Sequence, residues 1–383
     1  MTAPDRQTVN LLRAVVATRL DGRAEKLAQL AAHFTSWEEV LASAKRHGIV
    51  PTLYSSLAAC GDLIPASAQE LLQREFESNA FHCIANTAEL LEVLKTFADA
   101  GIAAMPFKGV VLGASAYGDT TNRNAGDLDL LIYRHDLRRA TEILKSRGYT
   151  LTTNVLEDGT PELEHHFEYH FERAADGIVL ELRWRLELTK ARFRQVVGLD
   201  WAWPRRRMVQ LAGVAVPSLD PVSTLLVLCM HGSKHVWSRL MWICDVARLL
   251  ESEPELDWAF AVREAKRLGL WRCLALGVLL AHQVTGAHVP EPVLKSFRAD
   301  GAARRMAGFF EQYTFEDPGR KPRGHAPYKI QILGFRDKAR MVLSPAFLRP
   351  NLSDRAAVKL PKYLNVLYYI VRPFRLLLDR SGR

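Results

Sequence analysis

The chain has 383 residues, of which 48% are apolar and 24% are charged, so its composition is that of an ordinary globular protein with a sizeable core. A chain of this length is expected to form two or three domains. Its five scattered cysteines include no Cys-x-x-Cys pair, which argues against a disulfide framework and against a zinc site. With no run of about 18 apolar residues and no signal-peptide pattern, we expect a cytoplasmic protein without a membrane-spanning helix.

The net charge of +9 is unevenly distributed along the chain. Residues 320–383 contain 15 lysines and arginines and three acidic residues, which leaves 36 basic and 39 acidic residues in the other 319. Attraction of an anionic partner is therefore expected only from this C-terminal segment. Its arginines interleave with Tyr363, Tyr368, Tyr369 and Phe374. This pattern suits a packed final helix with solvated arginines, contact with a membrane surface, or contact with nucleic acid.

Hydrophobic patterns divide the chain into four regions. Residues 1–100 are predicted to be helical, and residues 101–190 alternate between strands and helices as an α/β core. Residues 191–315 are helical again, and residues 316–383 form the basic segment, which ends in an amphipathic helix. The predicted fold class is therefore α+β, a small mixed sheet flanked by helical regions.

Within the core, Asp176-Gly177 is a favourable turn between two strands. After the core, Asp220-Pro221 is expected to begin a helix, since proline is favoured at the first helical position. The patterns predict strands near 102–107, 127–133, 164–173, 178–185 and 213–216, and helices near 66–100, 109–117 and 136–147.

Asp127 and Asp129 lie two residues apart in a run of aliphatic residues. The period of a strand puts both carboxylates on one face, while Leu128 and Leu130 face the other way. Two like charges side by side on a buried strand are costly unless a cation lies between them. Carboxylate oxygens suit magnesium, so this pattern predicts a divalent-metal site.

Glu181 is the candidate third carboxylate, because it lies between hydrophobic stretches of another expected strand. Its alternative role is an ion pair with Arg183 or Arg185. Three carboxylates from neighbouring strands can hold two divalent ions that bridge a nucleoside triphosphate and an attacking oxygen. Such ions activate the nucleophile and stabilise the leaving pyrophosphate.

Lys108 and Gly109 mark the turn from the first expected strand to its helix. A glycine here lets the backbone approach a phosphate, and the helix N-terminus beyond it offers unpaired N–H groups. Lys108 adds a positive charge. Arg123, four residues before the aspartate pair, has two open roles, which are contact with a phosphate and a pairing that locks the loop onto an aspartate.

His231, Lys234 and His235 share one face of a predicted helix. In a cleft, Lys234 would neutralise charge on the leaving pyrophosphate with His235 beside it, whereas His231 is equally compatible with a buried core histidine. This basic group also includes Arg239. Asp245, an acidic residue on an otherwise apolar helix, is expected to pair with one of these basic residues.

His165, His166 and His170 form a second group of histidines, in which His166 and His170 face the same side of a strand. No cysteine or paired carboxylate supports a transition-metal site there, so structural roles are favoured. His166 is also a candidate for the acceptor side of the cleft.

Taken in order, these motifs resemble an uncharacterised bacterial nucleotidyltransferase family of the DNA polymerase β-like superfamily. The resemblance covers most of residues 30–250, and the Gly-Ser turn usual in the superfamily is Lys-Gly here. The residues that carry it are Trp37, His47-Gly48-Ile49-Val50-Pro51, Lys108-Gly109, Tyr117, Arg123, Asp127-Leu128-Asp129, His165-His166, Leu180-Glu181-Leu182-Arg183-Trp184, Lys234-His235-Val236-Trp237 and Asp245.

The resemblance implies that the protein uses Mg²⁺, with two ions, to transfer a nucleoside monophosphate from an NTP such as ATP to an unknown acceptor. It implies that Asp127, Asp129 and Glu181 are catalytic metal ligands and that Lys108 and Gly109 hold the triphosphate. The other candidate nucleotide-binding residues are Arg123, Lys234 and His235. Two alternatives stay open: a nucleotide-binding regulator or scaffold without turnover, and a toxin-like enzyme that modifies tRNA. The basic C-terminal segment is the only feature of the sequence that favours the second.

Overall fold

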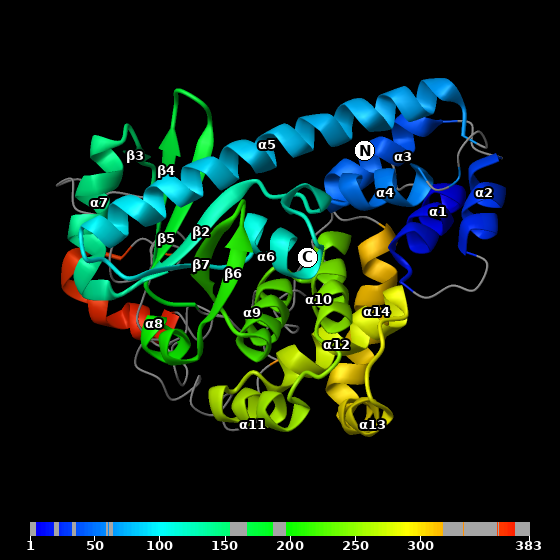
Figure 1. Ribbon diagram of the computed structural model, residues 1–383. Helices are drawn as coiled ribbons and strands as arrows, with labels where there is room; N and C mark the ends of the chain where they lie inside the picture. The colour runs from blue at the N-terminus through cyan, green and yellow to red at the C-terminus, as the bar shows by residue number, and fades with distance from the viewer. Residues whose placement is uncertain are drawn as a thin grey trace.

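The computed structural model describes residues 5–18, 23–32, 36–58, 60, 64–153, 167–186, 197–316, 332, 358 and 360–371. A mixed sheet lies at one side of the molecule, and the N-terminal helices gather with those of residues 271–316 at the other (Figure 1). The predicted α+β class is confirmed. None of the helices within these ranges is long and apolar enough to cross a membrane.

The element bounds follow the hydrophobic patterns closely. The strands are β1 (Ala104–Pro106), β2 (Asp127–Ile132), β3 (Thr150–Leu151), β4 (Glu168–Arg173), β5 (Ile178–Arg183), β6 (Arg207–Leu211) and β7 (Val214–Ser218). The helices are α1 (Arg6–Val16), α2 (Arg23–Ala32), α3 (Trp37–His47), α4 (Val50–Ala58), α5 (Ala66–Asp99), α6 (Gly109–Ala116), α7 (Leu137–Ser146), α8 (Leu199–Ala202), α9 (Pro221–Lys234), α10 (Leu240–Ser252), α11 (Trp258–Leu268), α12 (Trp271–Thr285), α13 (Glu291–Ala299) and α14 (Gly301–Glu316).

Five strands form the main sheet in the order β1-β2-β5-β4-β3. β2 and β5 run parallel, and every other neighbouring pair is antiparallel. The hairpin expected at Asp176-Gly177 joins β4 to β5, and Gly177 has the positive φ of 71° that such a turn requires. The register places Asp129 beside Glu181 and Glu181 beside His170, so three chemically active residues form one row across the sheet.

α5 and α7 cover one face of this sheet. Leu128 and Leu130 of β2 point into that layer and are almost fully buried there. Because side chains alternate along a strand, Asp127 and Asp129 must face the opposite side. The apolar layer therefore fixes the register that aims both carboxylates away from α5, since a slip by one residue would bury them against its apolar side chains.

A second core joins the N-terminal helices to the helices that follow the sheet. Buried residues of α1, α3 and α4 pack in one cluster with those of α9, α10, α12 and α14. The backbone N–H of Thr18 donates a hydrogen bond to the carbonyl of Thr285 at 2.7 Å, and Arg13 lies over the ring of Phe315. The N-terminal helices are thus packed against the helices that face the sheet. Domain boundaries near residues 101 and 191 stay a prediction.

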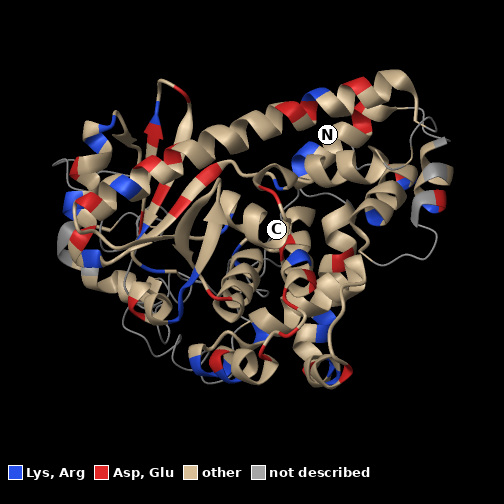
Figure 2. Ribbon diagram, viewed as in Figure 1, with Lys and Arg blue, Asp and Glu red and all other residues tan. Residues whose placement is uncertain are grey.

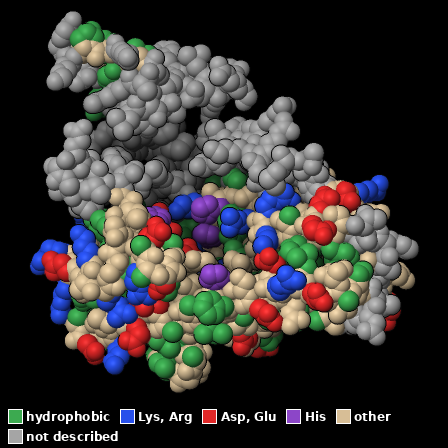
Figure 3. Space-filling view, turned by 90° about the horizontal axis from the view of Figure 1, so that it is seen from above, with side chains coloured by type: hydrophobic (Ala, Val, Ile, Leu, Met, Phe, Trp, Pro, Cys, Tyr) green, Lys and Arg blue, Asp and Glu red, His purple; other side chains and the backbone are tan. Residues whose placement is uncertain are grey.

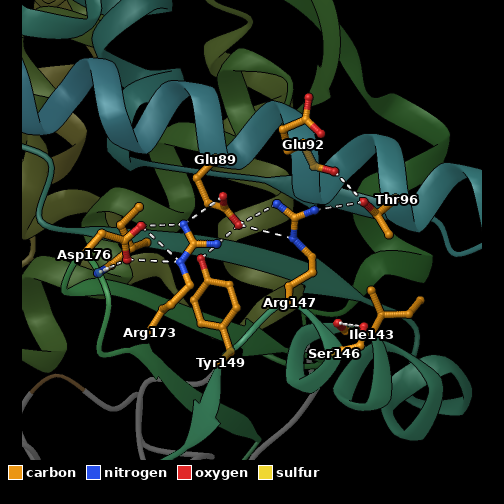
Figure 4. A network of polar contacts seen from close by, with 10 residues as sticks. Glu89, Glu92, Thr96, Ile143, Ser146, Arg147, Tyr149, Arg173 and Asp176 are labelled. Atoms are coloured by element: carbon orange, nitrogen blue, oxygen red, sulfur yellow. Dashed lines mark hydrogen bonds and ion pairs between the residues drawn. The ribbon is translucent and has the colours of Figure 1, made fainter.

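Buried polar groups fasten α5 to the far edge of the sheet (Figure 4). Glu89 accepts hydrogen bonds from Arg147 at 3.0 Å, Arg173 at 2.9 Å and the hydroxyl of Tyr149 at 3.2 Å. These partners come from the end of α7, from β4 and from the segment before β3. One carboxylate thereby satisfies two guanidinium groups and a phenol in a region of low dielectric.

Replacement of Glu89 by Ala is expected to lower the free energy of unfolding by about 3 kcal/mol, because it removes the shared carboxylate of two partly buried arginines and leaves the buried phenol of Tyr149 without its acceptor. Urea denaturation measures the change. Glu92→Ala is the matched control, since Glu92 is exposed on the same helix, and it should change stability by less than about 0.5 kcal/mol. Equal losses in the two variants would contradict this account.

Several expectations can be compared with the strands directly. The strands expected near 102–107, 127–133 and 178–185 correspond to β1, β2 and β5, and the helix expected near 66–100 is α5. The strand expected at 164–173 is described from Glu168 onward, and residues 164–166 lie outside the described ranges. β7 was expected, but β6 was not, because β6 buries only Val209 and Leu211 and gives a weak pattern.

Candidate active site

Three carboxylates meet on the face of the sheet opposite α5. Asp127 and Asp129 project from β2, and Glu181 projects from the parallel neighbour β5 in register with Asp129. One carboxylate oxygen from each lies within 4.8 Å of the others. Asp129 is only 3% exposed. The positions of acidic residues on the central strands are coloured red on the ribbon in Figure 2. The structure thus brings together the three residues that the sequence predicted as a metal site.

The turn from β1 to α6 lies directly beside the carboxylates. Lys108 and Gly109 have positive φ angles of 61° and 48°, a conformation costly for Lys and easy for Gly. A Cβ on Gly109 would lie 3.3 Å from the backbone carbonyl oxygen of Asp127. The Lys108 ammonium lies 2.8 Å from Asp129 Oδ2. The strained turn therefore holds a cation and the N-terminus of α6 next to the metal-site candidates, which is typical of functional sites.

Arg183 forms ion pairs with three carboxylates at once. Its guanidinium lies 3.3 Å from Asp129 and also contacts Glu181 and Glu168. The Glu181–Arg183 pair that the sequence left as an alternative role is therefore formed. His170 lies 3.3 Å from Glu181 and 3.5 Å from Glu168. Together with Lys108, Arg183 offsets the repulsion among the carboxylates in the protein without bound metal.

Helices α9 and α10 form the opposite wall of a cleft of about 690 Å³ that the carboxylates line. His231 and His235 lie one helical turn apart, with ring centroids 4.6 Å from each other, and the Trp242 ring lies 5.5 Å and 5.2 Å from them. The Lys234 ammonium lies 3.9 Å from Glu168. Seen from above, histidine, lysine and arginine side chains gather along this hollowed part of the surface (Figure 3). The helix-face prediction is confirmed.

An unusual turn joins α9 to α10 and sets the position of that wall. Val236 and Trp237 both have positive φ angles, 53° and 50°, which are unfavourable for branched and bulky side chains. The Trp237 ring is fully buried against Gly232, where a Cβ would lie 2.5 Å from it. Thr314 donates a hydrogen bond to the Trp237 carbonyl at 2.8 Å. Packing against the helical core therefore stabilises the strained turn that ends α9 at Lys234.

Arg123 is buried and makes a bidentate pair with Asp245. Its Nε donates to Oδ1 at 2.7 Å and its Nη2 donates to Oδ2 at 2.9 Å, while the Tyr117 hydroxyl donates to Oδ1 at 2.8 Å. Of the two roles left open for Arg123, locking the loop onto an aspartate is the one the geometry supports. The expectation that Asp245 pairs with a basic residue of the His231–Arg239 group is wrong, because its side chain faces α6 and the loop before β2 instead.

Buried polar side chains of α5 hold the loop that leads to the carboxylates. Asn79 donates to the carbonyl of Thr121 at 3.0 Å, and Asn86 donates to the carbonyl of Ala125 at 2.9 Å. These amides lie on one side of the helix, so α5 fixes residues 121–126 just before Asp127. The N-terminal region, which the sequence predicted only to be helical, therefore positions a site residue through these contacts.

A sequence model of the family described as uncharacterised nucleotidyltransferases matches residues 34–286, well over half of the chain. The chain belongs to this nucleotidyltransferase family. The matched range contains every candidate site residue from Lys108 to Asp245, so the family expected from the ordered motifs is confirmed at this level. A search of the curated proteins found no match.

The three carboxylates of this nucleotidyltransferase fit a hard divalent cation. They offer only oxygen ligands from two adjacent strands, and oxygen is the donor type that Mg²⁺ prefers. The neighbouring charge of Asp129, followed by burial, raises the pKa of Asp127. Burial alone would raise the pKa of Asp129, yet Lys108 and Arg183 keep it below its usual range. Burial and the charges of both aspartates raise the pKa of Glu181 to about 7. A bound cation would relieve this repulsion.

Divalent-metal affinity is therefore expected to rise with pH between 6 and 8. Glu181 is protonated below about pH 7 and must lose its proton to act as a ligand, so below that value the dissociation constant should rise up to about tenfold per pH unit. Because its pKa is raised on folding, the metal-free protein also loses stability as the pH rises through about 7. Calorimetry with Mg²⁺ and Mn²⁺ at three pH values tests this.

Glu181→Gln is the control for that measurement, since it removes the titrating group and should leave a weaker affinity with a shallower pH dependence. Wild-type affinity that stays constant between pH 6 and 8 would contradict the assignment of Glu181 as a ligand.

The two basic residues of the opposite wall, Lys234 and His235, differ in charge at neutral pH. Burial, with the charge of Lys234, lowers the pKa of His235 to about 4, and burial lowers that of Lys234 to about 8. At neutral pH Lys234 is thus the cation and His235 is neutral.

Arg46, Glu168 and Trp242 are among the cleft-lining residues that the sequence did not identify. Glu168 lies two residues before His170 on β4, so the strand period alone could have placed both side chains on the same face. Arg46 lies in the last turn of α3, where a basic residue is usual, so nothing in its local pattern pointed to the site. His165 and His166 lie outside the described ranges, and the acceptor-side role of His166 stays a prediction.

Proposed function

We propose that the protein transfers a nucleoside monophosphate from an NTP to an acceptor in a reaction that depends on Mg²⁺, as in DNA polymerase β-like nucleotidyltransferases. The observation that carries the proposal is the convergence of Asp127, Asp129 and Glu181 within 4.8 Å beside the Lys108-Gly109 turn, in a chain of a nucleotidyltransferase family. Carboxylates next to a helix N-terminus combine a cation site with a phosphate site.

Each group has a role in this proposal. Asp127, Asp129 and Glu181 would hold Mg²⁺, which when bound would neutralise charge on the triphosphate and activate the attacking oxygen. The α6 N-terminus at Gly109 presents backbone N–H groups to the phosphates. Lys108, whose ammonium lies 2.8 Å from Asp129 Oδ2, supplies a positive charge beside the same phosphates. Lys234, protonated at neutral pH, faces the charge that develops on pyrophosphate.

The test is incubation of the protein with each α-labelled NTP, Mg²⁺ and fractions of a cell lysate. Label transferred by the wild type should be absent from the double variant Asp127→Asn/Asp129→Asn. Digestion of the labelled fraction with nuclease or protease then assigns the acceptor to RNA, protein or small molecules, and an RNA acceptor would favour the toxin-like alternative. Transfer that persists in the double variant would refute the assignment of the carboxylates.

A regulator or scaffold without turnover would behave differently in the same experiment. It would bind NTP and Mg²⁺ in calorimetry and label nothing in any fraction. The complete set of three carboxylates weighs against this alternative, because a binding protein has no need to keep like charges buried together at a cost in stability.

A further inference from the structure

The basic side chains of the cleft are not equally neutralised. Arg123, Lys108, Arg183 and Lys234 each have at least one carboxylate within 4.0 Å. Arg46 and Arg239 line the same cleft, and neither forms an ion pair with any acidic residue in the described ranges. The cleft therefore holds two cations beyond those that balance its own carboxylates, and these cations can receive an anionic ligand.

The two arginines meet where the N-terminal helices join the opposite wall. Arg46 lies in the last turn of α3 and Arg239 lies immediately before α10. The next residue of each takes part in one buried hydrogen bond, in which the Leu240 N–H donates to His47 Nδ1 at 3.3 Å. Burial, followed by the charges of Arg46 and Arg239, lowers the pKa of His47 to about 4. The charges of both guanidinium groups therefore act on the same imidazole ring.

The geometry of Arg46 leaves hydrogen-bonding capacity unused. Its Nη2 donates to Ser43 Oγ at 2.8 Å, but its Nε is buried with no hydrogen-bond partner among the described atoms. A buried N–H group without an acceptor is costly, and a guanidinium presents its N–H groups in a fork that matches phosphate oxygens. Arg46 also lines the cleft, so an oxyanion bound there would accept hydrogen bonds from this guanidinium.

An aromatic surface lies next to the arginines. The Arg239 guanidinium carbon is 5.9 Å from the centre of the Trp242 ring, and the His235 ring lies on the same wall at 5.2 Å from that ring. His235 is exposed and Trp242 is half-buried, so both have ring surface facing the cleft. Stacking of a nucleic-acid base on an aromatic side chain contributes about 1–3 kcal/mol and does not depend on base identity.

We propose that Arg46, Arg239 and Trp242 form a nucleotide subsite, in which the two arginines bind a phosphate group and the indole stacks on the base. The subsite lies on the wall opposite the carboxylates, so it receives a nucleotide unit that reaches across the cleft. That unit belongs either to the NTP or to a nucleotide end of the acceptor. The inference deepens the proposed function and rests on it for turnover, whereas binding at the subsite is measurable without turnover.

Calorimetry with two probes distinguishes the sources. The first probe is an NTP analogue with a non-hydrolysable α,β linkage, in the presence of Mg²⁺, and the second is a 5′-phosphorylated dinucleotide added to protein saturated with that analogue. The variants are Arg46→Gln/Arg239→Gln and Trp242→Ala. Each is expected to weaken binding of one probe by about tenfold or more, the loss of one charged hydrogen bond or one stacked base.

Arg248→Gln is the matched control, because Arg248 lies on the same helix, pairs with Glu251 and is not among the cleft-lining residues. It should bind both probes within about twofold of the wild type. Trp242→Phe should recover most of the affinity lost in Trp242→Ala, whereas Trp242→Leu, which keeps apolar packing without an aromatic face, should not. Weaker analogue binding assigns the subsite to the NTP, and weaker dinucleotide binding assigns it to the acceptor.

Failure of the subsite and failure of the proposed function give different results. If neither probe binds the wild type, or if both bind all variants as tightly as the control, the subsite is overturned even where labelled transfer is observed. If a probe is weakened as expected but no NTP labels any lysate fraction, the subsite stands and the proposed transfer fails. Thermal unfolding of each variant, which should match that of the control, separates these effects from misfolding.

Discussion

Replacement of Asp127 by Asn is expected to reduce nucleotidyl transfer by about 10³-fold or more while leaving the metal-free protein as stable as the wild type or more stable. The loss follows from removal of a ligand of the proposed Mg²⁺ site, whose effect is several kcal/mol of transition-state stabilisation. The gain in stability follows from the raised pKa of Asp127, because Asn relieves its repulsion with Asp129. Activity and stability should therefore change in opposite directions.

Asp129→Asn provides the contrast, since the two aspartates are in different environments on one strand. Asp129 is paired with Lys108 and Arg183, which hold its pKa low, so its replacement should abolish activity and also destabilise the metal-free fold. Labelled transfer and urea denaturation without metal measure both properties. Asp200→Asn, on the exposed side of α8, is the control and should change neither. Equal destabilisation by Asp127→Asn and Asp129→Asn would contradict this picture.

Replacement of Asp245 by Ala is expected to lower the free energy of unfolding by about 3–5 kcal/mol, the effect of leaving a buried charge uncompensated. Asp245 is 1% exposed, and Arg123, its bidentate partner, is 6% exposed. The variant would leave the Arg123 guanidinium buried without its carboxylate and the Tyr117 hydroxyl without its acceptor. Chemical denaturation at neutral pH is the measurement.

The same variant should weaken binding of divalent metal, because Arg123 ties the loop before Asp127 to α10 and to the Gly109 carbonyl. Tyr117→Phe is the matched control, since it removes one hydrogen bond to the same carboxylate, leaves the ion pair and should cost only about 1 kcal/mol. An Asp245→Ala protein with wild-type stability would show that Arg123 finds another partner and that the bidentate pair does not hold the loop.

Local pattern determined the chemistry of the site. The two-residue period of a strand and the aliphatic neighbours of Asp127 and Asp129 were enough to predict their common face, and β2 confirms it. Lys108-Gly109 was identified as a strand-to-helix turn because a strand pattern precedes it and a helix pattern follows it. The helix expected at Asp220-Pro221 is α9, and Asp220 caps it through two backbone N–H groups. Each of these features depends on residues within a few positions of one another.

Only the tertiary structure decided which distant residues share a contact. Arg123 and Asp245 are 122 positions apart, and no spacing rule connects them, so the sequence placed the partner of Asp245 wrongly. Arg46 enters the cleft because α3 packs against the start of α10, where His47 and Leu240, 193 positions apart, are hydrogen-bonded. Long-range pairs depend on how whole layers pack, and that packing is set by the summed burial of many apolar side chains rather than by any local motif.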